Sequence, residues 1–389
     1  MITRIAAKHI KELSESFKAI AIVGPRQSGK TTLARNIFKE KQYVSFENPD
    51  KRRFMTEDPR GFLELYKEGA IFGEVQRVPE LFSYLQQILD ENPARGQFIL
   101  TGSNNFLLQE NISQSLAGRI AYLYLLPFSN KEAETLMGER QTLEDAIFKG
   151  GYPAIYDNNI APNKWLPNYI NTYVERDLRQ IKNISNLATF ERVIKLCAGR
   201  IGQLLNLSSL AIEAGVDSKT IASWLTILQS SFIIYLLQPY HQNFNKRLVK
   251  MPKLYFYDTG LASSLLGITH VDQIPLHPLK GSLFENFAIN ELVKERFNNN
   301  EPHNLYFWRD HTGNEIDIVI DRGTSLYPIE IKSGKTVTSD YFKNFDFWKK
   351  ITGTAEGTVI YGGDQEQKRS NGIKVMPWNN IHTLEKEPG

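Results

Sequence analysis

Short apolar runs alternate with helical patterns over the first 130 residues. Four runs have the length of buried strands and occupy residues 18–23, 43–48, 70–76 and 97–105. A strongly helical segment, TLARNIFKE, directly follows the first of them. This alternation of strand and helix predicts an α/β domain at the start of the chain.

Helical periodicity dominates the next 65 residues or so, in segments such as NKEAETLM, TLEDAIFKG and NYINTYVERDLRQIKN. A helix at 209–215, a glycine-containing turn and an amphipathic helix at 218–231 then follow, and this order is typical of a helix-turn-helix. Two strand-like runs, 232–240 and 253–260, complete the pattern. We therefore expect a helical lid followed by a winged-helix unit.

The winged-helix unit carries candidate contacts to DNA. Lys219 and Thr220 begin the second helix, where they would face DNA phosphates. A basic stretch between the two strands suits a wing and comprises Lys246, Arg247, Lys250 and Lys253. The alternative is a protein-binding or lid module, because such units also serve those roles. In either case Trp224 and Leu228 are expected to pack in the core.

Domain boundaries follow from these patterns and from Pro- and His-containing connections. We expect a first α/β domain over 1–130, a helical lid over 131–185, a winged helix over 186–275 and a last α/β domain over 276–389. The C-terminal EKEPG is expected to be a frayed end. The fold class is thus a multidomain α/β protein.

Composition narrows the class of protein. Hydrophobic residues at 41% and charged residues at 23% exclude a wholly disordered chain. A single cysteine, Cys197, excludes an internal disulfide and a cysteine zinc cluster, which favours a reducing cytoplasm. No apolar run approaches the ~18 residues of a membrane span. A net charge of +3 is too small to argue for nucleic acid by itself.

A phosphate-binding loop is the strongest local signal. Residues 24–31 read G-x-x-x-x-G-K-T between a strand and a helix, which is the P-loop pattern for ATP or GTP. Lys30 would neutralise the β and γ phosphates, and the Thr31 hydroxyl would hold Mg²⁺. The residues expected to bind nucleotide are Gly24, Pro25, Arg26, Gln27, Ser28, Gly29, Lys30, Thr31, Thr32 and Ser103.

The acidic strand that should accompany this loop is incomplete. Its usual ending is Asp-Glu, in which Asp holds the Mg²⁺ shell and Glu orients the attacking water. Here Gly73 stands in the Asp position and only Glu74 remains. We therefore expect nucleotide binding with impaired hydrolysis. The alternative is that Glu74 is an ordinary surface acid.

Two further polar positions follow the later strands. Ser103 and Asn104 fall where a residue would sense the γ-phosphate, and Arg119 could contact nucleotide in its own or in a neighbouring subunit of a homo-oligomer. The alternative is that Arg119 is ordinary surface.

Several motifs together resemble a widespread prokaryotic family that joins an AAA-type ATPase domain to a C-terminal region of uncharacterised function. They are GPRQSGKTTLAR, EVQRVPELFSYLQ, ILTGSNNFLL, SLAGR, GGYP, YVERDL and KMPKLYFYDTGLA. The resemblance covers nearly the whole chain and implies an ATP-binding protein with an AAA-like strand order. Gly73 departs from the Asp that members usually show.

The last domain carries a second candidate site. A helix over 281–297 contains Glu285, and two alternating strands flank RGTS. A hairpin turning between Gly323 and Thr324 places Asp317 opposite Glu330 and Glu315 opposite Lys332, all on one face. Isoleucines anchor the other face; they are Ile316, Ile318, Ile329 and Ile331.

This arrangement resembles the PD-(D/E)xK nuclease core. The resemblance implies that Asp317 and Glu330 hold Mg²⁺, that Lys332 activates or orients the attacking water, and that Glu285 binds a second ion or tunes the first. Trp308, Arg309 and His311 could meet substrate, although such residues more often pack.

The sequence therefore predicts an ATP-gated switch on a module that acts on nucleic acid, with DNA as the candidate partner. Catalytic roles fall to Glu74, Arg119 and Lys332. The competing hypothesis is a non-enzymatic, nucleotide-responsive binding or regulatory protein, in which the C-terminal acids are structural.

Overall fold

The computed structural model describes residues 4–103, 116–172, 186–240 and 250–384. The chain divides into two compact units. Unit 1 contains residues 1–127 with the short segments 230–232 and 296–301, and unit 2 contains the remainder.

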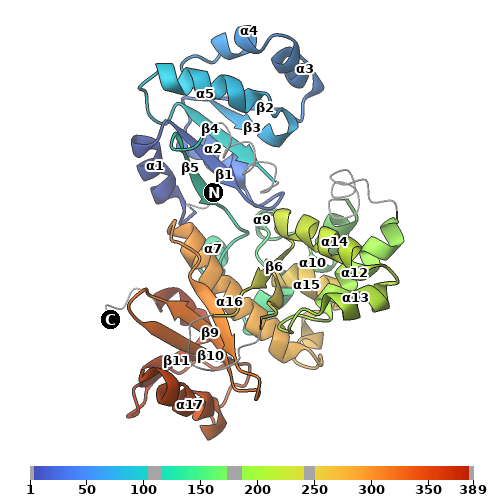
Figure 1. Cartoon of the computed structure of the whole chain (residues 1–389), viewed down its shortest axis with the longest axis vertical. Helices are drawn as coiled ribbons and strands as arrows, with labels where there is room; N and C mark the ends of the chain where they lie inside the picture. Colours follow the sequence, from blue (N-terminus) through green and yellow to red (C-terminus); the bar gives the residue numbers. More distant parts are fainter. Residues whose placement is uncertain (1–3, 104–115, 173–185, 241–249, 385–389) are drawn as a thin grey trace. The chain divides into compact units, whose positions relative to one another are not determined.

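A parallel sheet forms the centre of unit 1 (Figure 1). Its strands within the described residues are β1 (Ala19–Val23), β2 (Gln42–Ser45), β3 (Ala70–Gly73), β4 (Phe98–Gly102) and β5 (Ile120–Tyr124). Their order is β2-β3-β4-β1-β5, and every neighbouring pair is parallel. The predicted α/β domain with a parallel sheet is confirmed. The strand that separates the phosphate-loop strand from the acidic strand is β4.

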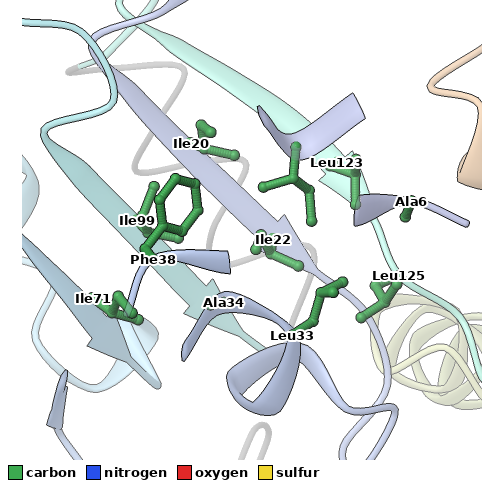
Figure 2. Close-up of a cluster of buried hydrophobic side chains, with 11 residues drawn as sticks. Ala6, Ile20, Ile22, Leu33, Ala34, Phe38, Ile71, Ile99, Leu123 and Leu125 are labelled. Carbon is green, nitrogen blue, oxygen red and sulfur yellow. The ribbon is translucent and has the colours of Figure 1, made fainter. Parts of the chain in front are cut away.

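Helices connect these strands in the described part of unit 1. They are α1 (Ala7–Ser16), α2 (Lys30–Ile37), α3 (Pro49–Glu57), α4 (Pro59–Glu64) and α5 (Leu81–Glu91), with a 3₁₀ turn at Val75–Arg77. Figure 2 shows aliphatic side chains of β1, β3 and β4 packed against Leu33, Ala34 and Phe38. This packing buries the apolar face of α2 and fixes its start beside the end of β1.

Unit 2 opens with short helices. The α-helices described before β8 are α7 (Asn130–Met137), α8 (Leu143–Lys149), α9 (Pro153–Asp157), α10 (Pro162–Tyr169), α12 (Leu187–Ala198), α13 (Leu207–Ala214), α14 (Ser218–Ser230) and α15 (Thr259–Leu265), with α16 (Lys280–Asn298) following them. The strands β6 (Ile234–Leu237) and β7 (Lys253–Phe256) pair antiparallel. The expected frayed end, 385–389, lies outside the described residues.

The turn between α13 and α14 has clear local causes. Gly215 adopts φ 74°, a left-handed conformation that ends α13 at low cost. The Asp217 carboxylate then accepts hydrogen bonds from the backbone N–H groups of Lys219 and Thr220, both at 2.9 Å, and so begins α14. Trp224 and Leu228 are buried, which confirms their predicted packing.

A second sheet completes unit 2. It contains β8 (Leu305–Arg309), β9 (Glu315–Asp321), β10 (Leu326–Lys332), β11 (Gly357–Tyr361), β12 (Gln367–Lys368) and β13 (Ile373–Pro377), in the order β12-β13-β11-β10-β9-β8. The strands β10, β11 and β13 run parallel, and β8, β9 and β12 run antiparallel to their neighbours. Helices α16 (Lys280–Asn298) and α17 (Lys343–Thr352) accompany the sheet.

The hairpin of β9 and β10 has the predicted register. Ile329 pairs with Ile318 and Leu326 with Asp321, which directs Asp317, Glu330 and Lys332 to one face. The isoleucines of the other face are all buried. Trp308 is also fully buried, 5.6 Å from Trp348 between ring centroids, so the idea that it meets substrate is wrong and its role is packing.

Helix α16 is joined to β7 by a buried amide. The Asn286 side chain accepts from Phe256 N at 2.8 Å and donates to Phe256 O at 2.7 Å, and it is fully buried. The amide thus supplies both hydrogen bonds that a neighbouring strand would give to Phe256. Removing it leaves two buried backbone groups without partners.

We expect Asn286→Ala to lower the free energy of unfolding by about 2 kcal/mol, because both Phe256 groups lose their partner. Urea unfolding followed by circular dichroism measures this change. Asn163→Ala, which removes an exposed bond to Thr269 O, should change stability by less than about 0.5 kcal/mol. Equal losses in the two variants would contradict the argument.

Candidate functional site

The phosphate loop lies between the end of β1 and the start of α2. Gly29, the residue before α2, adopts φ 93°, which non-glycine residues rarely take. A side chain at Gly24 would place its Cβ 2.1 Å from the carbonyl oxygen of Leu125, so only glycine fits there. Both glycines of the motif are therefore required by the backbone, and the loop places the start of α2 at the carboxyl edge of the sheet.

Lys30 is held inside the loop. Its Nζ donates to the carbonyl oxygens of Gly24 at 2.9 Å and Pro25 at 2.6 Å. Burial lowers its pKa to about 8, although nearby Glu74 acts in the opposite direction. Ser28 is fully buried, and its Oγ has no hydrogen-bond partner. A buried ammonium and an unsatisfied hydroxyl fit the phosphate chain of a nucleotide.

The other predicted loop residues surround these two. Arg26 forms an ion pair with Glu47 at 3.1 Å, and Gln27 is exposed with φ 63°. Thr31 is half-buried in the first turn of α2, and Thr32 is exposed.

Glu74 lies directly after β3, at the same edge of the sheet as the loop. Its Oε2 accepts hydrogen bonds from the Ser103 hydroxyl at 3.0 Å and from Gln76 Nε2 at 2.7 Å. The residue adopts φ 57°, an uncommon conformation for a non-glycine side chain. Parallel pairing of β3 with β4 brings Glu74 and Ser103 together, and Gln76 was not predicted as part of this group.

The place of the missing aspartate is filled. A Cβ at Gly73 would lie 2.6 Å from the Tyr43 hydroxyl oxygen and 2.9 Å from its ring. Tyr43 carries no sequence signal that links it to Gly73, since only the pairing of β2 with β3 reveals that the two positions meet.

Arg119 lies at the opposite edge of the sheet. It precedes β5, which runs parallel to β1, whereas the phosphate loop follows β1. Its guanidinium forms two hydrogen bonds with the Asp90 carboxylate, at 2.5 and 2.9 Å. The prediction that Arg119 contacts nucleotide in its own subunit is therefore wrong, because the side chain lies at the edge of the sheet opposite the phosphate loop. Contact with a neighbouring subunit stays a prediction, and Asn104 lies outside the described residues.

The second candidate site lies on the hairpin of β9 and β10. Lys332 Nζ lies 3.2 Å from Asp317 Oδ2 and 2.5 Å from Glu330 Oε2. Asp317 Oδ2 also accepts from Ile331 N at 2.7 Å, and Glu330 Oε2 accepts from Asn344 Nδ2 at 3.1 Å. Asn344 comes from α17 and has no sequence signal that would link it to the hairpin.

Glu330 is the most unusual of these groups. It is fully buried, and its Oε1 has no hydrogen-bond partner. Burial, reinforced by the charge of Asp317, raises its pKa to about 8. Burial disfavours the charge of Lys332, but the two carboxylates outweigh this effect and raise its pKa. An unsatisfied carboxylate oxygen beside a second carboxylate fits an Mg²⁺ ion between Asp317 and Glu330.

Glu285 is engaged elsewhere. Its Oε1 accepts from Lys253 Nζ at 3.1 Å and from the Tyr255 hydroxyl at 2.5 Å. Among the described side chains, no group of three or more His, Cys, Asp and Glu is arranged to hold a metal ion. The expected metal set of Glu285, Asp317 and Glu330 is therefore not assembled, because Lys253 and Tyr255 hold the Glu285 carboxylate.

Lys253 also corrects the expected wing. It is buried and forms ion pairs with Glu285 and Glu315, so it cannot face DNA phosphates. Lys250 is exposed, while Lys246 and Arg247 lie outside the described residues. Arg309 forms an ion pair with Glu315 at 3.1 Å, and His311 is exposed. The burial of Lys253 could not be predicted from the sequence, because a basic residue beside an apolar strand is usually exposed.

Among the described residues, no helix is both long and apolar enough to span a membrane.

Comparison with known proteins gives three matches to family models. Residues 16–134 match an AAA domain, residues 140–272 a domain of unknown function (DUF8612), and residues 280–381 another domain of unknown function (DUF4143). The last two descriptions state no chemistry.

Relatives resemble the chain over most of its length. The "Uncharacterized protein Rv2008c" of Mycobacterium tuberculosis is 29% identical over 98% of this chain and 84% of its own length. An "Uncharacterized protein" of Haemophilus influenzae is 22% identical over 91% of this chain and 92% of its own.

Among solved structures, AMPPCP-bound DnaA from Aquifex aeolicus is 13% identical, with a TM-score of 0.31 over 58% of this chain and 86% of its own, an overlap too low to carry a structural argument. Residues 16–134, which carry the phosphate loop, are therefore similar to an AAA domain.

Proposed function

We propose that this chain binds ATP at its P-loop and uses the bound nucleotide to control a C-terminal module that acts on nucleic acid. The observation that carries the proposal is the phosphate loop itself. Its glycines are required by the backbone, Lys30 is buried against the loop carbonyls, and the Ser28 hydroxyl is unsatisfied. These atoms need a ligand with several negatively charged oxygens.

Each residue of the proposed nucleotide site has a separate role. Lys30 turns from the loop carbonyls to the β and γ phosphates, and the amides at the start of α2 bind the same oxygens. The Thr31 hydroxyl holds Mg²⁺, which supplies positive charge to the phosphates. Glu74, fixed by Ser103 and Gln76, accepts a hydrogen bond from the attacking water. Turnover is slow because Gly73 gives the metal no carboxylate.

In this proposal, nucleotide binding at the P-loop changes the activity of the domains that follow it in the chain. We assign residues 131–185 to a helical lid, 186–275 to a winged helix and 276–389 to a nuclease-like domain. Lys219 is exposed at the start of α14, which supports a DNA-facing role, whereas Thr220 is half-buried and its hydroxyl donates to Asp217. Arg119 contacts nucleotide across a subunit boundary if the chain forms a homo-oligomer.

A second activity is favoured by Glu330. We propose that Asp317 and Glu330 hold one Mg²⁺ ion and that Lys332 orients a water for attack on a phosphodiester, as in PD-(D/E)xK nucleases. The buried, unsatisfied Oε1 of Glu330 supports this role. Glu285 acts as a positioning residue, because its carboxylate is held by Lys253 and Tyr255. The non-enzymatic alternative keeps nucleotide binding and treats these acids as structural.

Lys30→Ala should weaken ATP binding at least about tenfold, because it removes a charge-assisted contact to the phosphates. Isothermal titration calorimetry with ATP and Mg²⁺ measures the change. Lys39→Ala, which alters an exposed lysine beyond α2, serves as the matched control and should bind as the unmodified protein does. Equal affinities in all three proteins would refute the proposed site.

ATP affinity should fall as the pH rises above about 8, because Lys30 loses its proton there in the free protein. The nucleotide favours the charged lysine, so binding must take up a proton, and the dissociation constant rises by up to about tenfold per pH unit. Titrations between pH 7 and 10 test this slope. Lys30→Arg keeps its charge throughout, so its affinity should stay flat over the same range.

Asp317→Asn and Lys332→Met should each abolish Mg²⁺-dependent cleavage of DNA, because each removes one member of the proposed site. Gel assays on single-stranded and duplex DNA measure cleavage, and Mn²⁺ binding by electron paramagnetic resonance reports the metal in Asp317→Asn. Asp340→Asn, an exposed acid paired with Lys343, should leave both readouts intact. If the unmodified protein neither cleaves DNA nor binds Mn²⁺, the acids are structural.

A further inference from the structure

We infer that the Tyr43 hydroxyl takes the place of the missing acidic-strand carboxylate and binds a water of the Mg²⁺ shell around bound nucleotide. This inference rests on the proposed ATP site. It assigns a positioning role to a residue of β2 that carries no recognisable motif, and it explains why glycine follows the apolar part of β3.

The geometry at Gly73 is specific. A Cβ built there would lie 2.6 Å from the Tyr43 hydroxyl oxygen, 2.9 Å from ring Cε2 and 3.1 Å from Cζ. Gly73 does not belong to the glycines with positive φ, so its backbone would accept any side chain. A side chain at position 73 is therefore excluded by lack of space, because the Tyr43 ring and hydroxyl occupy that volume.

Tyr43 is fixed in this position from several sides. Parallel pairing sets Tyr43 beside Ile71 and Ser45 beside Gly73, so Tyr43 and Gly73 lie two residues apart along the sheet on one face. The ring packs on the core between the sheet and α2, and the Arg35 guanidinium lies 5.4 Å from the ring centroid. A ring held in this way presents its hydroxyl at the carboxyl edge of β3.

The same edge holds the other groups of the nucleotide site. Glu74 follows Gly73 in the chain, and Thr31 lies in the first turn of α2, the helix whose side chains pack in the same core as Tyr43. An aspartate at position 73 would direct its carboxylate toward this region and hold the metal shell. The hydroxyl oxygen of Tyr43 lies where such a side chain would begin, so it can accept a hydrogen bond from a metal-bound water.

A hydroxyl and a carboxylate differ in charge. The phenol is neutral, so it orients a water without adding a negative charge, and its hydrogen bond is roughly half as strong as one to an ionised group. Mg²⁺ should therefore increase ATP affinity, but less than it would with an aspartate. The same substitution predicts slow turnover without loss of nucleotide binding, because Lys30 and the loop amides are untouched.

The test compares ATP affinity with Mg²⁺ and with EDTA in one set of variants. Tyr43→Phe removes only the hydroxyl and keeps the ring packing, so the gain in affinity on adding Mg²⁺ should fall about fivefold, the effect of one neutral hydrogen bond. Affinity in EDTA should not change. Loss of affinity in both conditions would point to a structural role for Tyr43 and overturn the inference.

The reciprocal change uses Gly73. Gly73→Asp alone should lower the melting temperature and should not raise the Mg²⁺ effect, because the tyrosine blocks the new side chain. Tyr43→Ala/Gly73→Asp opens the space, and its Mg²⁺ effect should exceed that of the unmodified protein by about tenfold, whereas Tyr43→Ala alone should show the same reduced effect as Tyr43→Phe. If Gly73→Asp and the double variant behave alike, Tyr43 does not occupy the aspartate position.

These results separate the inference from the proposal on which it rests. Failure of the unmodified protein to bind ATP in either condition refutes the ATP site and the inference together. ATP binding that depends on Lys30 but shows equal Mg²⁺ effects in the unmodified protein and in Tyr43→Phe refutes the inference alone.

Discussion

Parallel pairing of β1 with its neighbours is the constraint on which the nucleotide site depends. Because β1, β3 and β4 run in the same direction, the residues that follow them meet at one edge of the sheet. The phosphate loop, Glu74 and Ser103 lie far apart in the chain and reach each other only through this register. The buried face of α2 completes the site, since its packing fixes where the loop must end.

Unit 2 depends on polar groups buried along α16. Asn286 replaces a strand partner for Phe256, and Lys294 donates to Phe128 O at 2.9 Å and to Glu291 at 3.0 Å. Glu291 in turn accepts from Asn130 N at 2.8 Å. Buried polar groups are costly unless they are satisfied, so each of these bonds fixes one position of the neighbouring chain.

Ammonium groups act as internal cations in the C-terminal part of unit 2. Lys253 joins two carboxylates from different elements, and Lys332 joins Asp317 to Glu330. Desolvation alone would make a buried lysine neutral, but the paired carboxylates reverse this effect and raise the pKa of each lysine. The lysines thereby hold the acids of each cluster together. Lys253 comes from β7, and its carboxylate partners come from α16 and β9. One network of charges therefore joins these three elements.

Local features could be predicted from the amino-acid sequence. Motif spacing predicts the glycines and Lys30 of the phosphate loop and the strand that precedes them. The period of a strand predicts the isoleucine face of the hairpin and its register. Contacts between distant residues depend on the three-dimensional fold. It moved Arg119 to the opposite edge, buried Lys253 against Glu285, and set Tyr43 against Gly73. Strand order and packing between elements determine such contacts, and neither leaves a periodic signal in one sequence.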